Sequence, residues 1–526
     1  MSDRDMRASE KRWGWATVAF LVVLITGAAV RFYFADANSY WLDELYSVTW
    51  YGTANQTVLD AMNRVTRSVQ LPLYYFILNI WMQIFGDSEV ATRSLSNAYV
   101  VGATICLFLT IRKLYGPWSG VIVGLIFTLM FTPTYYGMES RGYAQTLFLS
   151  SLSTLLLTYA LPHLAEKSWR TLLQDGWIIA LLVTNYGLLM THYYNVMFLG
   201  AQALFLIVYL LHRNTAGAVD ALLKSVAVGV TPLVVLIVTW APFMLTSYKK
   251  NASKYVVEGS PTVPWKSLSE LVISPNFLTQ YTYSIAIFLI VAIIAITLVR
   301  LIRRADEQAL FMLWFVLAAL VPTFLAFILF TISGYERYNP RYFSFSVGPL
   351  AVLIVLGIYE VLSLAGRALH FAKPAVVLVL TAVIGAFLAY PGGLYALQQP
   401  KDDWRGIAAA IVERIEKEPD KTFVVYETTW KRFPTLNYYL KRFSDDIRVD
   451  QIFQREFEKE SRPVAFSPPD ADYVVVAFTH QKVRDWPKTR KAFGSKMTLV
   501  EQKLDKDGRG YLVYAVPQQP ERMSGP

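Results

Sequence analysis

Acidic and basic side chains lie beside long apolar runs in this sequence. Asp43 and Glu44 lie side by side in YWLDELYSV, just past the first apolar run. Other carboxylate, imidazole, ammonium, guanidinium and phenol groups lie near the ends of later runs: Glu139, Arg141, Tyr143, His192, Tyr193, Lys249, Lys250, Lys254, Arg337, Arg341 and Tyr342. A carboxylate can accept a proton and an arginine can hold an anion. Ionisable groups at membrane depth mostly mark function.

The Asp43–Glu44 pair also has a structural explanation. Aspartate is favoured at a helix N-cap and glutamate in the first turn, so the pair could simply begin the helix LYSVTWYG. Capping does not exclude chemistry. Adjacent residues on a helix point about 100° apart, so only one of the two carboxylates can face a given site.

The other candidates have structural alternatives as well. Glu139 and Arg141 could form an ion pair that only stabilises the fold, and His192 could be an interfacial histidine with satisfied hydrogen bonds. Lys249 and Lys250, with Lys254, could form a solvated or lipid-headgroup patch. The joint placement of all these residues therefore supports function more than any single one does.

The composition indicates a polytopic membrane protein. Of the 526 residues 54% are hydrophobic and 17% charged, against about 25% charged in a soluble domain. Several apolar runs reach the roughly 20 residues that cross a bilayer. The net charge of +10 stands largely in short loops between these runs, which favours a topology signal and contact with anionic lipids over nucleic-acid binding. Cys106 is the single cysteine, so an intrachain disulfide is excluded.

Apolar runs predict eleven spans, the first a retained anchor rather than a cleaved signal peptide. They are 13–33, 93–111, 117–134, 143–161, 176–193, 195–211, 224–245, 283–299, 309–331, 342–363 and 374–391. Basic residues alternate with the spans so that the N-terminus becomes cytoplasmic and the C-terminus lies outside. Lys249, Lys250 and Lys254 break this rule, because they fall in an outer loop.

The run at 71–85 holds only fifteen residues and suits a helix on the membrane surface. If it crossed, every basic loop after it would lie outside. We therefore predict a first external loop over about residues 34–92 and a transmembrane module over 1–398.

Residues 399–526 have the composition of a soluble domain. A helix over 403–417 places Trp404, Ala408, Ile411 and Ile415 on one face. The strand-like runs TFVVYE, DYVVVAF, MTLVEQ and GYLVYAV alternate with helical stretches. This pattern predicts a small α/β domain, extracytoplasmic by the span count. We expect it to help choose or orient an acceptor.

Six segments resemble, in order, the motifs of GT-C glycosyltransferases, which take a sugar from a polyprenyl-phosphate carrier. They are the Asp-Glu pair after the first span, QLPLYYFILNIWMQIFGDSEVATRSLS, YYGMESRGYA, THYYN, NPRYF and KDDWRG. The chain is most similar to the bacterial branch that includes aminoarabinose, galacturonic acid and protein mannosyl transferases. The resemblance implies the GT-C fold, with about 11 transmembrane helices, in a bacterial inner membrane.

The resemblance also implies roles for the candidates. Asp43, with Glu44 beside it, would be catalytic, and Asp43 would be the base of an inverting single displacement. The donor phosphate would be held by Arg341, Arg141, Lys249 and Lys250. The substrate would contact Glu139, Tyr143, His192, Tyr193, Arg93 and Tyr342.

The implied partners are a polyprenyl-phosphate-linked sugar, membrane lipids and an envelope acceptor, which could be a glycan, a glycolipid such as lipid A or lipopolysaccharide core, or a protein. No obligate cofactor or metal is expected, since the first loop lacks an Asp-x-Asp pair, although a divalent cation could bind. The alternative is a flippase of lipid-linked sugars or a binding scaffold. A flippase should carry polar residues along its spans on both sides, and the cytoplasmic ends show no such cluster.

Overall fold

The computed structural model divides the chain into two compact units, Met1–Asp36 with Tyr46–Gln399, and Ala37–Leu45 with Pro400–Pro526. The structure describes residues 3–51, 57–67, 70–213, 217–251, 294–296, 299, 306–333, 339–368, 373–399, 401–429, 435–443, 447, 449–453, 469–478 and 482–517. Residues 37–45 belong to the first loop by sequence but to the second unit by their contacts.

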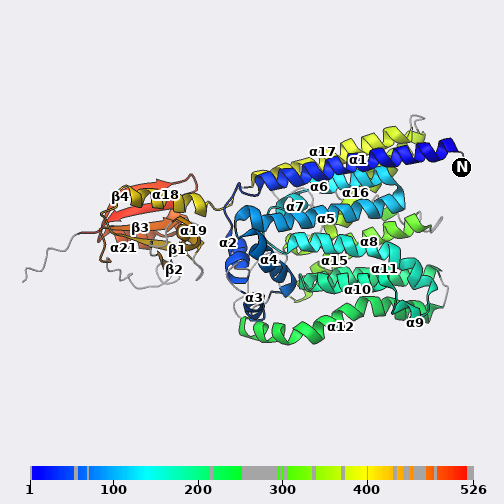
Figure 1. Cartoon of the computed structure of the whole chain (residues 1–526), viewed down its shortest axis with the longest axis horizontal. Helices are drawn as coiled ribbons and strands as arrows, with labels where there is room; N and C mark the ends of the chain where they lie inside the picture. The colour runs from blue at the N-terminus through cyan, green and yellow to red at the C-terminus, as the bar shows by residue number, and fades with distance from the viewer. Residues whose placement is uncertain are drawn as a thin grey trace, which may run out of the picture. The chain divides into compact units, whose positions relative to one another are not determined.

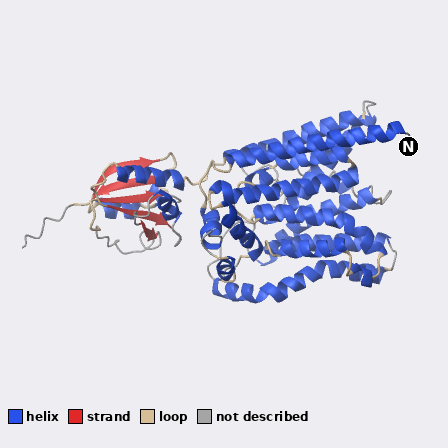
Figure 2. Ribbon diagram, viewed as in Figure 1, coloured by secondary structure: helices blue, strands red, loops and turns tan. Residues whose placement is uncertain are grey.

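The first unit is built of helices (Figure 1, Figure 2). They are α1 (Asp3–Phe34), η1 (Tyr46–Tyr51), α3 (Val58–Val65), α4 (Pro72–Phe85), α5 (Glu89–Tyr115), α6 (Pro117–Leu129), α7 (Phe131–Tyr136), α8 (Tyr143–Glu166), α9 (Trp169–Leu172), α10 (Gly176–Leu189), η2 (Tyr193–Asn195), α11 (Val196–Arg213), α12 (Ala218–Asn251), α15 (Glu307–Ser333), η4 (Pro340–Ser346), α16 (Val347–Ala368) and α17 (Pro374–Gln398).

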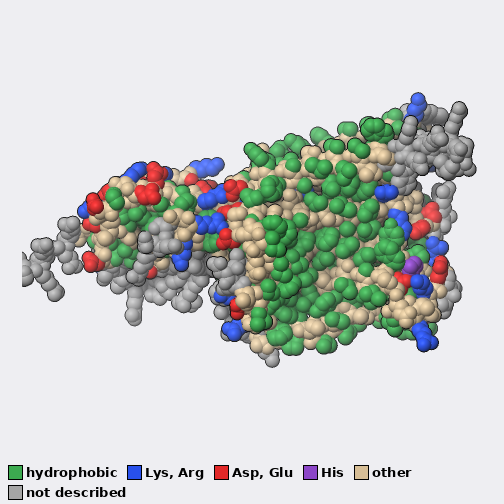
Figure 3. All heavy atoms as spheres, viewed as in Figure 1, with side chains coloured by type: hydrophobic (Ala, Val, Ile, Leu, Met, Phe, Trp, Pro, Cys, Tyr) green, Lys and Arg blue, Asp and Glu red, His purple; other side chains and the backbone are tan. Residues whose placement is uncertain are grey.

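Eight helices in the described part of the chain are long and apolar enough to cross a membrane, and α6 and α10 are shorter apolar helices. The visible face of this unit is largely hydrophobic between ends where charged side chains gather (Figure 3). The prediction of an α-helical, multi-pass membrane protein is confirmed. The predicted span 283–299 lies outside the described residues, apart from a few positions at its end.

Two predicted span ends are wrong where α17 packs against α6 and α7. The span 117–134 stops at Leu129, and a separate short helix, α7, begins at Phe131. The predicted span 374–391 is too short, because α17 continues through Pro391 to Gln398. Gly393 explains part of this, because a Cβ there would lie 2.4 Å from the Leu129 carbonyl oxygen. The glycine lets α17 pack closely on the α6–α7 junction, and this packing supports the helix beyond the proline.

The chain leaves and re-enters the helical bundle at one end between α1 and α5. Arg31 in the last turn of α1 donates to Asn97 Oδ1 near the start of α5 (2.8 Å), and Asn97 donates to the Ala28 carbonyl (2.9 Å). If α4 crossed the membrane, α5 would start at the opposite end of the bundle from the last turn of α1. We call this end the site end, formed by the end of α1 and the starts of α5, α8 and η2 (Figure 1).

The opposite end, where α1 begins, is held by hydrogen bonds between neighbouring helices near their ends. Tyr115 donates to the Gln308 carbonyl (2.7 Å) and Gln308 donates to the Leu114 carbonyl (2.8 Å). Lys224 Nζ donates to the Lys167 carbonyl (2.9 Å). These bonds bring the ends of α5 and α8 together with the starts of α12 and α15, so the predicted alternation of loops agrees with the arrangement of helices.

The second unit contains a five-stranded sheet in the order β2-β1-β3-β5-β4. Its strands are β1 (Phe423–Thr429), β2 (Val449–Phe453), β3 (Tyr473–Phe478), β4 (Thr498–Leu504) and β5 (Gly510–Ala515), and its helices are α2 (Leu42–Leu45), α18 (Trp404–Glu416), α19 (Thr435–Phe443), η5 (Val483–Asp485) and α21 (Pro487–Gly494). β1 pairs in parallel with β2 and β3, whereas β5 is antiparallel to β3 and β4. The predicted α/β domain is confirmed, and β2 is a strand that the sequence pattern missed.

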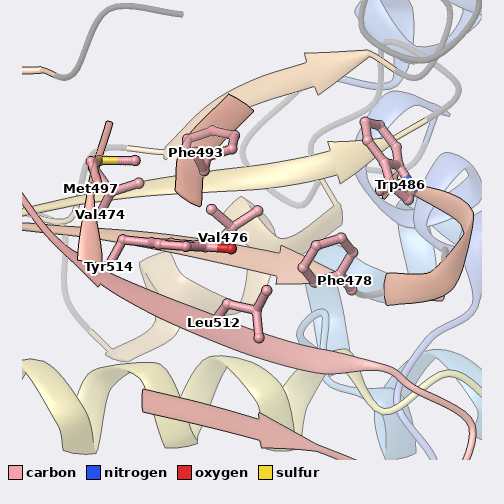
Figure 4. Packing of buried hydrophobic residues seen from close by; sticks show 8 residues of the cluster. All are labelled: Val474, Val476, Phe478, Trp486, Phe493, Met497, Leu512 and Tyr514. Atoms are coloured by element: carbon pink, nitrogen blue, oxygen red, sulfur yellow. The ribbon is translucent and has the colours of Figure 1, made fainter. Parts of the chain in front are cut away.

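Both faces of this sheet are covered. Alternate residues of β3 and β5 point to one face and pack around Trp486 and Phe493: Val474, Val476, Phe478, Leu512 and Tyr514 (Figure 4). On the other face the Arg414 guanidinium of α18 lies 5.2 Å from the Tyr473 ring centre. This period-two division is what a sheet with helices on both faces requires.

Candidate functional site

The Glu139–Arg141 turn lies at the site end, where it is tied to α5. Ser96 donates to the Glu139 carbonyl (2.6 Å) and Ser140 donates to Thr92 Oγ1 (2.7 Å). The Glu139 side chain is fully buried. Thr92 and Ser96, both in the ATRSLS stretch, therefore fix the backbone of the turn that carries Glu139 and Arg141.

Arg141 is held by residues from the first loop and from α4. Its Nη1 lies 3.3 Å from Ser47 Oγ and 3.3 Å from Tyr75 Oη, and it can donate to both. α4 is fixed in turn, since the Leu73 amide donates to the Met190 carbonyl at the end of α10 (3.2 Å). The PLYY motif thus contributes a tyrosine that orients a cationic side chain.

A second guanidinium approaches the same place from η4. Asn339 caps this short helix by accepting from the Arg341 amide (3.2 Å), and Pro340 is suited to its first position. The Arg341 guanidinium carbon lies 5.7 Å from the Tyr143 ring centre, and that of Arg141 lies 5.9 Å from the same centre. Tyr143 is buried. The structure therefore gathers two predicted cations around one predicted aromatic ring.

Aromatic rings continue this cluster. The His192 ring centre lies 5.1 Å from that of Tyr342 and 6.2 Å from that of Tyr143. Tyr194 stacks on Tyr342 at 5.1 Å. Tyr193 lies next to His192 at 4.9 Å and is 43% exposed. The group joins the loop after α7, η2 and η4, and we call Arg141, Tyr143, His192, Tyr194, Arg341 and Tyr342 the cationic–aromatic cluster.

His192 is neutral in this setting. Burial, together with the positive charges of Arg141 and Arg341, lowers its pKa to about 3. Its Nδ1 accepts from the Tyr194 amide (3.3 Å). The imidazole therefore adds no positive charge near neutral pH, and the cationic character of the cluster comes from the two arginines.

The other predicted cations, Arg93 and the two lysines, belong to α5 and α12. Arg93 is buried, and its Nη1 donates to the Ala35 carbonyl at the end of α1 (2.6 Å). This bond ties α5 to the start of the first loop. Lys249 and Lys250 lie in the last turn of α12, and their side chains lie outside the described residues.

The adjacent carboxylates of the first loop have different surroundings, both within the second unit. Glu44 is fully buried, and its Oε2 lies 3.1 Å from Lys401 Nζ. The Trp41 amide also donates to this carboxylate (3.3 Å). Asp43 is only partly buried. The helical geometry that allows one carboxylate to face a site thus turns Glu44 into the domain and leaves Asp43 the more accessible.

Sequence reasoning missed four residues that these contacts single out. Tyr75 and Ser47 orient Arg141, Tyr194 stacks in the cluster, and Lys401 pairs with Glu44. Each of the four lies inside a quoted motif, but the sequence does not show which residue it contacts. Within the described ranges no group of three or more His, Cys, Asp or Glu residues gathers where a metal ion could be held.

No protein-family model matches the chain, and no curated protein matches it by sequence. Its structure is similar to the crystal structure of ArnT from Cupriavidus metallidurans bound to undecaprenyl phosphate, with a TM-score of 0.51 and 15% identity over 98% of this chain and 99% of that one. The apo ArnT structure from the same organism gives a TM-score of 0.52 and 15% identity over 95% of this chain and 98% of that one. At this identity the likeness concerns the fold. The chain has the GT-C fold that its ordered motifs predict.

Proposed function

We propose that this protein is an integral membrane glycosyltransferase that moves a sugar from a polyprenyl-phosphate carrier to a hydroxyl group of an envelope acceptor. The observation that carries the proposal is the cationic–aromatic cluster, where Arg141 and Arg341 flank the ring of Tyr143. Guanidinium groups bind phosphate through a planar fork of donors. The fold is that of ArnT, whose crystal structure holds undecaprenyl phosphate.

In the proposed reaction the acceptor oxygen attacks the anomeric carbon of the donor as the bond from that carbon to the phosphate oxygen breaks. A single displacement of this kind inverts the anomeric centre. The hydroxyl proton passes to the Asp43 carboxylate. The leaving polyprenyl phosphate gains negative charge, which Arg341 and Arg141 stabilise. Lys249 and Lys250 are further candidates for this contact. The reaction so written needs no metal ion.

Asp43 is the proposed base because Glu44 is buried in an ion pair while Asp43 is not fully buried. Glu44 is accordingly assigned a supporting role.

The sugar and its neighbours would contact the aromatic part of the cluster. Tyr193 is exposed beside His192, and the Tyr342 ring lies 5.1 Å from that of His192 and 5.7 Å from the Arg341 guanidinium carbon. A neutral His192 can accept or donate a hydrogen bond to a sugar hydroxyl without competing for the phosphate. Glu139 would act on the substrate from the same turn as Arg141. Arg93 would act indirectly, through the Ala35 carbonyl that it holds.

We further propose that the site end faces away from the cytoplasm. The basic residues at the opposite end then lie in the cytoplasm, as the positive-inside rule requires: Arg112, Lys113, Lys167, Arg170, Arg213, Arg367 and Lys373. In a bacterial inner membrane this places the N-terminus in the cytoplasm and the C-terminal domain in the periplasm.

Mass spectrometry of envelope glycans, lipids and proteins tests the function. A strain lacking the gene should lose one sugar modification that the intact gene restores and the Asp43→Asn gene does not. Accumulation of the sugar-linked carrier in the Asp43→Asn strain is expected as well. Restoration of the modification by Asp43→Asn would contradict the proposed chemistry. If the protein were a flippase, the deletion strain would instead keep the sugar-linked carrier on the cytoplasmic side, and Asp43→Asn would retain activity.

A further inference from the structure

The first-loop segment, residues 37–45, is bound by the start of the C-terminal domain. The Lys401 amide donates to Asn38 Oδ1 (3.2 Å) and the Arg405 amide donates to Ser39 Oγ (3.0 Å). Ser39 in turn donates to Asp403 Oδ1 (3.4 Å). The KDDWRG stretch, residues 401–406, therefore holds the first residues of the segment through its backbone and one carboxylate.

The rest of the segment is buried in the same domain. The Tyr40 amide donates to Tyr439 Oη (2.7 Å), and the Tyr40 ring lies 6.0 Å from that of Tyr438. The side chains of Tyr40 and Leu45 are fully buried and that of Leu42 is nearly so. Asp43 thus stands on a short helix whose other residues are fixed inside the domain.

We propose that the C-terminal domain positions the catalytic aspartate, with Lys401 as the main positioning residue. Lys401 pairs with Glu44, the residue next to Asp43, and both side chains are largely removed from solvent. An ion pair of this kind has a defined geometry, which fixes the rotation of α2 about its axis. This inference rests on the proposed function of Asp43 as the base, and it gives KDDWRG a role beyond acceptor recognition.

Positioning has a large effect on a proton-transfer step. A displacement of about 1 Å of a catalytic group lowers a rate about 100-fold. Loss of the Lys401 charge leaves Glu44 buried without this partner, so α2 should turn or loosen. Carrier binding should be unaffected, because Lys401 is not part of the cationic–aromatic cluster. The signature of positioning is therefore slower transfer with unchanged binding.

The test compares full-length Lys401→Met, Lys401→Arg and Ser39→Ala with the wild type. Arg414→Met is the matched control, since Arg414 pairs with Glu418 and Glu501 in the same domain and not with residues 37–45. Hydrogen exchange of the peptide covering residues 37–47 measures how firmly the segment is held. Transfer is measured per molecule of protein in membranes of the complemented strain, and carrier binding is measured with undecaprenyl phosphate.

In Lys401→Met we expect faster exchange in residues 37–47, transfer lowered about 10- to 100-fold, and binding of undecaprenyl phosphate within about twofold of wild type. Lys401→Arg should recover transfer to within about threefold because the charge returns. Ser39→Ala should shift exchange in the same direction to a smaller extent, and Arg414→Met should leave the exchange of this peptide unchanged.

Unaltered exchange in both Lys401→Met and Ser39→Ala would overturn the anchoring. Faster exchange with normal transfer would overturn its catalytic importance. Failure of the proposed function is recognised separately. Normal transfer by Asp43→Asn would show that Asp43 is not the base, whereas the hydrogen-exchange result would still report how firmly the segment is held.

Discussion

Lys401 Nζ lies 3.1 Å from Glu44 Oε2, although the two residues are 357 positions apart in the chain. Glu44 is fully buried and Lys401 is 9% exposed. Removing one partner of a buried pair leaves the other charge uncompensated, which costs about 3–5 kcal/mol. Because of this pair, we propose different roles for the two adjacent carboxylates of the first loop.

The first prediction separates Asp43 from Glu44. Asp43→Asn keeps the size of the side chain but cannot accept the proton, so transfer should fall at least about 100-fold while undecaprenyl phosphate still binds. Glu44→Gln should act through stability, lowering the thermal unfolding midpoint together with transfer. Thermal unfolding and transfer measured on both variants distinguish the two effects. Near-normal transfer by Asp43→Asn would contradict the assignment of Asp43 as the base.

The second prediction concerns Arg341. Arg341→Ala should weaken binding of undecaprenyl phosphate and also slow the chemical step, because in the proposed reaction Arg341 contacts the phosphate both before and during its departure. Arg341→Lys should recover only part of this loss, since an ammonium lacks the planar fork of donors. Binding and transfer are measured on both variants, with Arg367→Ala at the opposite end as the control. Full activity of Arg341→Ala would exclude its role.

The third prediction follows from the lowered pKa of His192, about 3. An unfolded histidine titrates near 6.5, so between pH 7 and 5 the unfolded chain gains a proton that folded His192 does not. The folded state therefore loses up to about 2 kcal/mol of stability over this range from this residue. His192→Gln should unfold with a flatter pH dependence. Equal pH dependence of the two unfolding midpoints would show that His192 titrates normally.

The fourth prediction concerns the side of the membrane that each end faces. Asp87→Cys and Lys113→Cys, each in a Cys106→Ser background, place single probes at the two ends of α5. An impermeant thiol reagent added to intact cells should label Asp87→Cys and reach Lys113→Cys only after lysis. Labelling of Asp87→Cys from the cytoplasmic side alone would reverse the topology and move the candidate site to the cytoplasm.

The fifth prediction addresses the C-terminal domain as a whole. Acceptor recognition alone would allow a chain truncated after Gln398 to bind donor and hydrolyse it slowly. Because residues 37–45 are buried in this domain, truncation should instead abolish donor hydrolysis as well as transfer, while undecaprenyl phosphate still binds. Release of sugar from the carrier is the measurement. Hydrolysis that persists after truncation would restrict the domain to acceptor choice.

The sequence alone determined the membrane class, most helix positions and the residue types of the site. Apolar runs report bilayer-spanning helices directly, because backbone groups in lipid must bond within their own segment. The order of motifs indicated the GT-C fold and pointed to Arg141, Tyr143, His192 and Arg341. These signals depend only on residues that are close in the sequence, so one sequence is enough to detect them.

Only the tertiary structure decided which of these residues meet. Period-two and period-3.6 patterns indicate which face of an element is apolar, but they do not reveal its partner in the chain. The pairing of Glu44 with Lys401 and the approach of Arg141 and Arg341 to Tyr143 join distant segments. The continuation of α17 through Pro391 likewise depends on packing at Gly393, which overrides the local tendency of proline to end a helix.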